Sequence, residues 1–157
     1  MISHTCRIRL AAAADAPAIA RLSRDAIEAG LEWSWTPRRV AASVHDAATN
    51  VIVARRAGEL LGFAIMTYDD EAAHLLLLAV RAAQRRGGVG SALLGWLEAT
   101  VRAAGLRAIH LETRKRSAAA RAFYRRHGYA ETGEIAGYYQ GVEDAVRMVK
   151  TDLRPRP

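Results

Sequence analysis

Three glycines fall within four positions in segment 84–94, which reads QRRGGVGSALL and follows the apolar residues 75–80. Because glycine adopts positive φ at no steric cost, successive N–H groups there can turn toward one point. A helical pattern begins in the same segment, and a helix start adds unsatisfied donors and the positive end of the dipole. Arg85 and Arg86 bring two more positive charges. This combination favours a bound phosphate or pyrophosphate. A tight turn with solvated arginines is the alternative.

The glycine spacing differs from the two commonest phosphate motifs. The segment lacks the Lys-Ser/Thr ending of a P-loop, and it does not match the G-x-G-x-x-G of a dinucleotide fold. Its form is R-x-x-G-x-G, with Arg85, Gly88 and Gly90 at the named positions. The motif alone does not identify the ligand, so other features of the sequence are needed to identify it.

Other reactive residue types give weaker signals. Cys6, the only cysteine, lies in the first predicted strand with no base beside it, which argues against covalent nucleophilic catalysis. His74 lies beside the strand before the glycines, where it reaches a substrate or, as the favoured interpretation, is a half-buried strand residue. The histidines show no metal-ligand spacing, so we expect no metal: they are His4, His45, His74, His110 and His127.

Hydrophobic periodicity predicts the elements that position the turn. Pairs of start and stop signals indicate two helices after the first strand, one from Asp15 to about Gly30 and one after the N-cap Thr36. The stretch 75–80 does not alternate, so we expect that strand to be buried on both faces. A helix that begins with Ser117 as its N-cap should end at Gly128. The remaining predictions are strands at 6–10, 51–54, 60–68, 72–80, 106–111, 129–135 and 144–148, and a helix at 89–101.

Length and composition indicate one globular domain at residues 1–153 with a frayed tail at 154–157. The chain has 157 residues, a net charge of +7 and 51% hydrophobic residues. Lys115 and Lys150 are the only lysines among the 23 basic residues, and the arginines are spread along the chain. No RNA-binding aromatic signature accompanies them, so we expect no nucleic-acid partner. The chain has neither an apolar run of about 18 residues nor a signal peptide, which predicts a cytoplasmic protein without a membrane partner.

The order of elements resembles the GNAT superfamily of acyl-CoA-dependent N-acetyltransferases. Two segments carry the resemblance: residues 80–94, with R-x-x-G-x-G, and residues 117–129, SAAARAFYRRHGY. Within the superfamily, residues 111–114 with Tyr124, and the Gly-Tyr-Tyr of 137–139, resemble the bacterial ribosomal-protein alanine N-acetyltransferases. The resemblance implies an α/β fold with a mixed, mostly antiparallel sheet of about seven strands and about four helices.

The resemblance further implies direct transfer of acetyl from acetyl-CoA to an amine, which is a protein N-terminus or a small molecule. The turn would bind the pyrophosphate of acetyl-CoA, and the strand before the turn would bind the pantetheine. The Val80 N–H would donate a hydrogen bond to the thioester carbonyl. Ser117 stands where the family usually has Asn. The expected cofactor-binding residues are Leu78, Ala79, Val80, Arg85, Arg86, Gly87, Gly88, Val89, Gly90, Ser91 and Ser117.

Two residues are candidates for proton transfer. Glu112 follows an apolar strand, where desolvation raises a carboxyl pKa and a water can relay the proton of an amine, so we expect it to be the general base. An ion pair with Arg114 or a neighbouring arginine is the alternative, and Glu71 is the second candidate base. Tyr124 would protonate the departing thiolate, or else it is an aromatic core residue.

The acceptor pocket and the assembly are predicted more loosely. Trp33, Trp35, Tyr138 and Tyr139 are candidates for contacts with the acceptor, although at least one tryptophan is expected to lock the first two helices together instead. We expect a monomer or a homodimer. A non-catalytic acyl-CoA sensor with the same fold is the alternative function, and retention of both Glu112 and Tyr124 favours catalysis.

Overall fold

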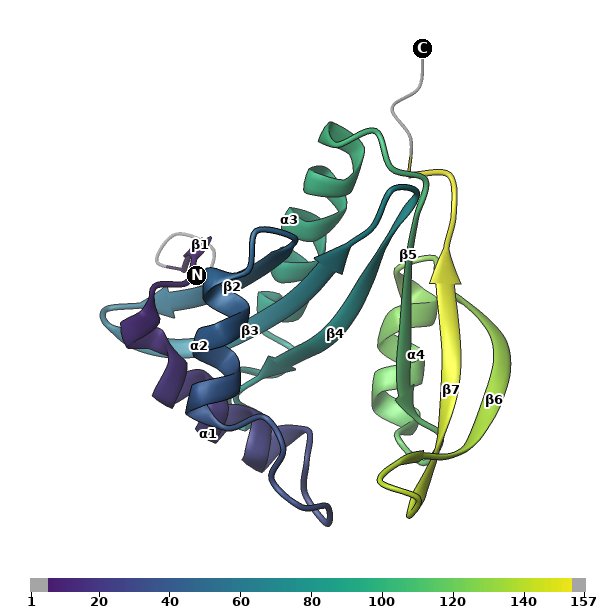
Figure 1. Cartoon of the computed structure of the whole chain (residues 1–157), viewed down its shortest axis with the longest axis horizontal. Helices are drawn as coiled ribbons and strands as arrows, with labels where there is room; N and C mark the ends of the chain where they lie inside the picture. The colour runs from purple at the N-terminus through teal and green to yellow at the C-terminus, as the bar shows by residue number, and fades with distance from the viewer. Residues whose placement is uncertain (1–5, 154–157) are drawn as a thin grey trace. The chain divides into compact units, whose positions relative to one another are not determined.

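A computed structural model describes residues 6–153 (Figure 1). The seven strands form one sheet in the order β1-β2-β3-β4-β5-β7-β6. The pairs β1/β2, β2/β3, β5/β7 and β6/β7 are antiparallel, whereas β4 and β5 run parallel. This arrangement and the four α-helices confirm the predicted fold class. The strands are β1 Arg7–Leu10, β2 Thr49–Arg56, β3 Glu59–Tyr68, β4 Ala72–Val80, β5 Ala108–Arg114, β6 Ala130–Tyr139 and β7 Glu143–Lys150; the helices are α1 Ala16–Ala26, α2 Pro37–His45, α3 Val89–Ala103 and α4 Ala118–Arg126.

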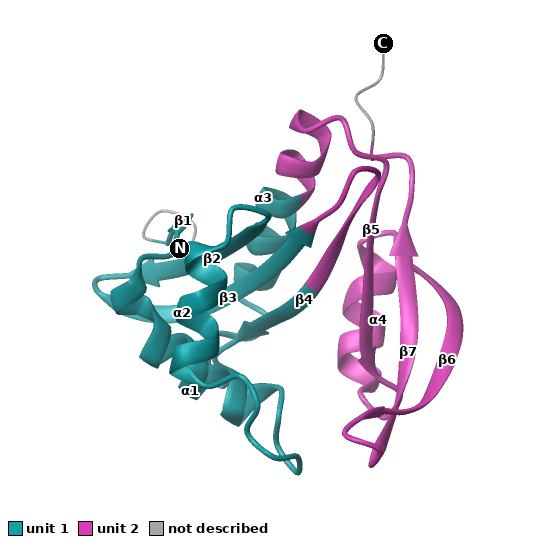
Figure 2. Ribbon diagram, viewed as in Figure 1, with its two compact units in different colours: residues 1–67, 76–97 teal, residues 68–75, 98–157 magenta. Residues whose placement is uncertain are grey.

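The chain divides into two compact units, coloured separately in Figure 2. The first comprises Met1–Thr67 and Leu76–Leu97, and the second comprises Tyr68–Leu75 and Glu98–Pro157. Both β4 and α3 contribute residues to the two units. The predicted tail at 154–157 lies outside the described residues. None of the described helices is long and apolar enough to cross a membrane.

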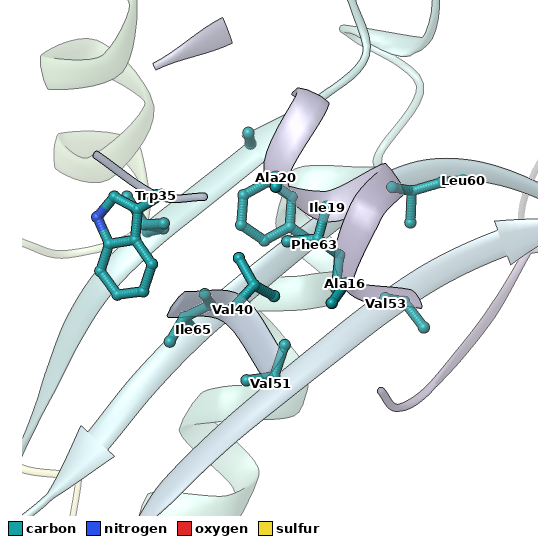
Figure 3. Packing of buried hydrophobic residues seen from close by; sticks show 12 residues of the cluster. Ala16, Ile19, Ala20, Trp35, Val40, Val51, Val53, Leu60, Phe63 and Ile65 are labelled. Carbon is teal, nitrogen blue, oxygen red and sulfur yellow. The ribbon is translucent and has the colours of Figure 1, made fainter. Parts of the chain in front are cut away.

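The core of the first unit lies between α1, α2 and strands β2 to β4 (Figure 3). Phe63 of β3 is fully buried, with Ile19 of α1 and Val40 of α2 in the same cluster. The start of α2 is set as predicted, because the Thr36 side chain accepts a hydrogen bond from the Arg39 N–H at 3.3 Å. The tight turn between β2 and β3 places Ala57 and Gly58 at positive φ, as a two-residue hairpin requires.

In the second unit, β7 pairs with both β5 and β6, and α4 contacts β5. Ser117 caps α4 as predicted, with its hydroxyl accepting the Ala120 N–H at 3.3 Å. The helix ends before Gly128, whose φ of +89° is the left-handed conformation that stops a helix. A buried polar pair ties this unit together: Tyr129 donates to Glu98 at 3.0 Å, and Lys150 pairs with the same carboxylate.

Two predictions about the strands need correction. β4 has the predicted bounds, but burial on both faces is wrong, since buried residues alternate with half-buried ones along its whole length. A uniform run of leucines hides this alternation, because both faces carry the same side chain. β5 extends to Arg114, so Glu112 lies within the strand and not after it. Glu112 and Arg114 alternate with the buried Thr113, as expected of a strand. All three residues pair with residues of β7, so the strand continues past Leu111.

Candidate active site

The glycine-rich turn of the first unit has the backbone conformation expected of an anion-binding loop. Arg86 has a φ of +67° and Gly88 a φ of +86°, so two left-handed residues flank Gly87 just before α3. Turn conformations of this kind form anion-binding concavities lined by N–H groups. A left-handed arginine was not foreseen, because arginine rarely adopts positive φ. Both Arg85 and Arg86 are exposed.

Part of this turn is held by its own hydrogen bonds. The Arg85 N–H donates to the Ala82 carbonyl at 3.3 Å, and the Gly87 N–H donates to the Gln84 carbonyl at 3.2 Å. The Gly87 N–H is therefore directed into the turn, which narrows the predicted row of phosphate donors. Gly88 and the first residues of α3 lie at the positive end of a 15-residue helix.

The strand before the turn lies unusually close to β3. A Cβ built on Gly62 would come within 2.8 Å of the Ala79 carbonyl oxygen and 3.2 Å of Leu93. The Arg81 N–H also donates to the Leu61 carbonyl at 2.8 Å. These contacts hold the end of β4, where the pantetheine residues Leu78, Ala79 and Val80 are predicted, against a rigid neighbour.

In the second unit, strand register brings Glu112 beside groups that are distant in sequence. His74 of β4 is directly opposite His110 of β5, and Glu112 is two residues further along the same face of β5. Across the antiparallel pair, Glu112 is opposite Arg147 of β7. The Glu112 side chain is only 4% exposed, compared with 28% for His74.

Three groups contact the Glu112 carboxylate. His74 Nε2 lies 2.7 Å and the Tyr138 hydroxyl 2.8 Å from Oε1, while Arg147 Nε lies 3.4 Å from Oε2. Burial alone would raise the pKa of this carboxyl. The hydrogen bonds from His74 and Tyr138, with the charges of His74 and Arg147, outweigh burial and lower the pKa of Glu112 to about 2. The predicted rise in its pKa is therefore reversed.

The alternative interpretation of Glu112 as an ion-paired residue is partly correct. Its arginine partner is Arg147 and not Arg114, which pairs with Glu143 at 2.8 Å. Glu71, the second candidate base, is exposed in the turn before β4. The carboxylate of Glu112 is thus a buried acidic group with His74, Tyr138 and Arg147 around it.

His110 completes the cluster. Its ring stacks on that of His74 with centroids 4.4 Å apart and planes 14° apart. Burial lowers the pKa of His110, and the neighbouring charge of His74 adds to this. Ligand atoms of His74, His110 and Glu112 lie within 4.8 Å of one another, a spacing that a metal ion could bridge. We assign no ion here, because two hydrogen bonds and the guanidinium of Arg147 already satisfy the carboxylate.

Tyr124 of α4 is 8% exposed, and desolvation alone raises the pKa of its phenol. Its ring makes edge contacts with Phe123 and Tyr129, as expected of a core aromatic residue. At neutral pH the phenol is protonated and is a hydrogen-bond donor. Its raised pKa favours donation of a hydrogen bond to a thiolate over complete proton transfer.

The four candidate acceptor-binding aromatics have different environments. Trp35 is 9% exposed in the core cluster, which agrees with the interpretation that one tryptophan locks the helix pair (Figure 3). Trp33 is 37% exposed and donates its indole N–H to the Ala20 carbonyl at 3.2 Å. Tyr138 is 43% exposed and Tyr139 is half-buried beside it, with ring centroids 4.9 Å apart. Trp33 and the two tyrosines remain candidates for acceptor contacts.

The partners of Glu112 escaped sequence reasoning for a physical reason. His110 and Glu112 are two residues apart, a spacing that places both on one face of a strand and that could have been noticed. His74 and Arg147 are brought in by a parallel and an antiparallel register respectively, and neither register follows from local periodicity.

Comparisons with known proteins agree with this geometry. The sequence profile described as the acetyltransferase (GNAT) family matches residues 16–129. An uncharacterised N-acetyltransferase of Methanocaldococcus jannaschii is 36% identical over 99 residues, which is 62% of this chain and 64% of that protein. The crystal structure of Ard1 from Thermoplasma volcanium superimposes with a TM-score of 0.83 at 25% identity, covering 94% of this chain and 97% of that one.

The structure of the ribosomal-protein-S18-alanine N-acetyltransferase of Escherichia coli superimposes with a TM-score of 0.82 at 26% identity. It covers 97% of this chain and 96% of that one. The profile match includes both the glycine-rich turn and α4, the two segments that carry the sequence resemblance. Because the family profile covers residues 16–129 of the 157, this chain belongs to the GNAT acetyltransferase family.

Proposed function

We propose that this protein is an acetyl-CoA-dependent N-acetyltransferase that transfers acetyl to a primary amine in a ternary complex. The observation that carries the proposal is the turn before α3, where left-handed Arg86 and Gly88 lie directly before a helix start and within the residues that the family profile matches. A pyrophosphate fits such a turn because it is anionic and the helix start is electropositive. The geometry of the turn favours an anion without identifying it. Membership of the family identifies that anion as the pyrophosphate of acetyl-CoA in this proposal.

The cosubstrate is held by backbone groups and a few side chains in this proposal. The N–H groups of Gly88 and of the first residues of α3, with the Arg85 guanidinium, bind the pyrophosphate, and the backbone of Leu78 to Val80 binds the pantetheine. The Val80 N–H donates to the thioester carbonyl, whose charge increases during attack. The Ser117 hydroxyl already accepts a hydrogen bond from the Ala120 N–H, so it binds the cosubstrate as a hydrogen-bond donor.

Proton transfer is assigned to the second unit. The cluster centred on Glu112 accepts the proton that the amine loses, and Tyr124 supports the departing thiolate from α4. An α-amino group has a pKa near ~8 and a lysine near ~10.4, so a protein or peptide N-terminus needs less assistance at neutral pH. The likeness to the S18-alanine N-acetyltransferase fold favours a peptide α-amine. A small-molecule amine is the other acceptor class.

Thermal unfolding with acetyl-CoA is the direct test of the cosubstrate. Ligand at 100 times its Kd adds about 2.7 kcal/mol, which raises the Tm by about 5–10 °C for a chain of this length. Arg85→Ala should reduce this shift, whereas Arg7→Ala on the exposed face of β1 should not. Absence of any shift in the folded wild-type protein would refute the acetyl-CoA assignment.

Thiol release with a panel of peptides and small amines then separates an enzyme from a non-catalytic acyl-CoA sensor. The enzyme releases CoA only when an acceptor is present, and Tyr124→Phe lowers kcat while leaving the thermal shift intact. A sensor shows the full thermal shift and no acceptor-dependent thiol release with any amine. An unchanged kcat for Tyr124→Phe at saturating substrates would remove this residue from the mechanism.

A further inference from the structure

The Glu112 carboxylate is already satisfied by protein groups, which makes it a weak proton acceptor. Two hydrogen bonds end on Oε1, Arg147 lies beside Oε2, and the side chain is 4% exposed. Hydrogen bonds from His74 and Tyr138 and the guanidinium of Arg147 stabilise the ionised carboxylate and lower its pKa, so a proton from the amine is held weakly there. The imidazole of His74, in contact with this carboxylate and 28% exposed, is the neighbouring group with a basic nitrogen.

The contact between Glu112 and His74 determines which nitrogen of His74 is basic. An ionised carboxylate only accepts hydrogen bonds, so the 2.7 Å contact places a proton on His74 Nε2. In the neutral ring the lone pair then belongs to Nδ1. His110 stacks on the same ring at 4.4 Å and limits its rotation. Tautomer and ring plane are both held by residues of β5.

The geometry points to His74 Nδ1 as the atom that accepts the proton of the acceptor amine, with Glu112 as the positioning residue that orients His74. This inference rests on the proposed function and refines its proton-transfer step. An N–H bond of the ammonium breaks, directly or through one water, the proton bonds to Nδ1, and the electron pair stays on the amine nitrogen for attack. The imidazolium so formed is stabilised by the carboxylate at its other nitrogen.

The surrounding charges are compatible with a temporary positive charge on His74. Glu112 of β5 is its close counter-charge, and Asp69 in the turn before β4 adds a second negative group near the stacked rings. Arg147 of β7 lies on the far oxygen of Glu112, and Tyr138 of β6 is neutral. His110 has a lowered pKa and stays uncharged, so the two stacked rings do not repel each other.

Two substitutions separate this assignment from one in which Glu112 accepts the proton. His74→Gln keeps an N–H donor for Glu112 but has no basic nitrogen, and we expect kcat at pH 7 to fall by roughly 10²–10⁴-fold with the KM for acetyl-CoA unchanged. Glu112→Gln keeps an acceptor for His74 Nε2, so its loss should be smaller. The loss in His74→Gln should shrink as the pH approaches the pKa of the amine, because neutral amine then needs no base.

His45→Gln, at the exposed C-terminal end of α2, is the matched control and should retain wild-type kcat. A ¹⁵N spectrum of histidine ring nitrogens gives a readout that does not depend on turnover. The signals lost in His74→Gln should show a protonated Nε2 and an unprotonated Nδ1, and Glu112→Ala should remove this preference. The variants are compared only after their thermal unfolding shows that they are folded.

Each outcome decides the assignment. A loss in His74→Gln that exceeds the loss in Glu112→Gln, with the expected tautomer, supports it. A His74→Gln enzyme within about threefold of wild type, or a protonated Nδ1 at neutral pH, overturns it while leaving the acetyltransferase function in place. A folded wild-type protein that acetylates no amine overturns the proposed function, and the role of His74 with it.

Discussion

Substitution of Gly62 by alanine tests whether the close approach of β3 and β4 supports the cosubstrate strand. The added Cβ would lie 2.8 Å from the Ala79 carbonyl oxygen, whereas ordinary contacts begin at 3.4 Å. The carbonyl must therefore retreat by about 0.6 Å, and it belongs to backbone, which cannot rotate away as a side chain does. Leu93 at 3.2 Å and Val89 at 3.3 Å leave no room on the other side.

We expect Gly62→Ala to lower the free energy of unfolding by about 1–3 kcal/mol, the usual cost of overpacking a core. For a chain of this length each kcal/mol changes the Tm by about 2–4 °C, so the Tm should fall by about 2–12 °C. Because Ala79 is also a predicted pantetheine residue, acetyl-CoA should raise the Tm of this variant by less than it raises that of wild type.

Gly95→Ala is the matched control. Gly95 lies in the interior of α3, and a Cβ built there meets nothing within 4 Å. Alanine in a helix interior is favoured over glycine by about 0.5–1 kcal/mol, so this variant should be more stable than wild type. Both variants are measured by thermal and urea unfolding. A Gly62→Ala protein as stable as Gly95→Ala would show that the β3–β4 contact relaxes freely, and the reasoning would be wrong.

Two further predictions concern buried carboxylates. Hydrogen bonds from Arg9, with those from Arg55, lower the pKa of Asp15 to about 2, so its stabilisation is complete above its ordinary pKa of 3.8 and is lost as the pH falls through about 2. In urea unfolding, Asp15→Asn should cost about 2 kcal/mol at pH 6 and less at pH 2.5, and a pH-independent cost would contradict this. Glu28 is 5% exposed and accepts three hydrogen bonds from Ser34 and Trp35. Glu28→Ala should lower stability by about 1–3 kcal/mol and change Trp35 fluorescence; an unchanged spectrum would count against that role.

The elements of this fold were largely predictable because their signals are local. Thr36 and Ser117 both cap helices in the structure as their positions indicated. The glycine-rich turn was recognisable because three glycines occur within four residues, although Gly88 alone among them has positive φ in the structure. The left-handed conformation of Arg86 was not predictable, since it follows from the turn as a whole and not from the residue type.

Residue environments were harder to predict than elements. The sequence indicated that burial would raise the pKa of Glu112, yet the structure reverses this shift. The burial of Glu112 could be inferred from the apolar residues before it in the sequence. The hydrogen-bond donors that lower its pKa could not, because they come from β4, β6 and β7. Trp33 and Trp35 illustrate the same limit, because a single residue separates an exposed indole from a core one. A short loop without periodicity does not show which side chain turns inward.

The cluster of His74, His110 and Glu112 depends on one parallel pairing, and this makes it sensitive to register. His74 is opposite His110 because Ala72 pairs with Ala108 and each later residue follows in step. A shift of one residue would move His74 to the other face of the sheet relative to Glu112. Such a shift would exchange one leucine for another on the buried face, because leucines follow one another from 75 to 78, so leucine burial alone does not hold the register. The shift would also turn His74 toward the buried face and separate it from Glu112, which would bury an imidazole without its hydrogen-bond partner. The free-energy cost of that unpaired polar group therefore opposes the shift, and the cluster itself helps to hold the register on which it depends.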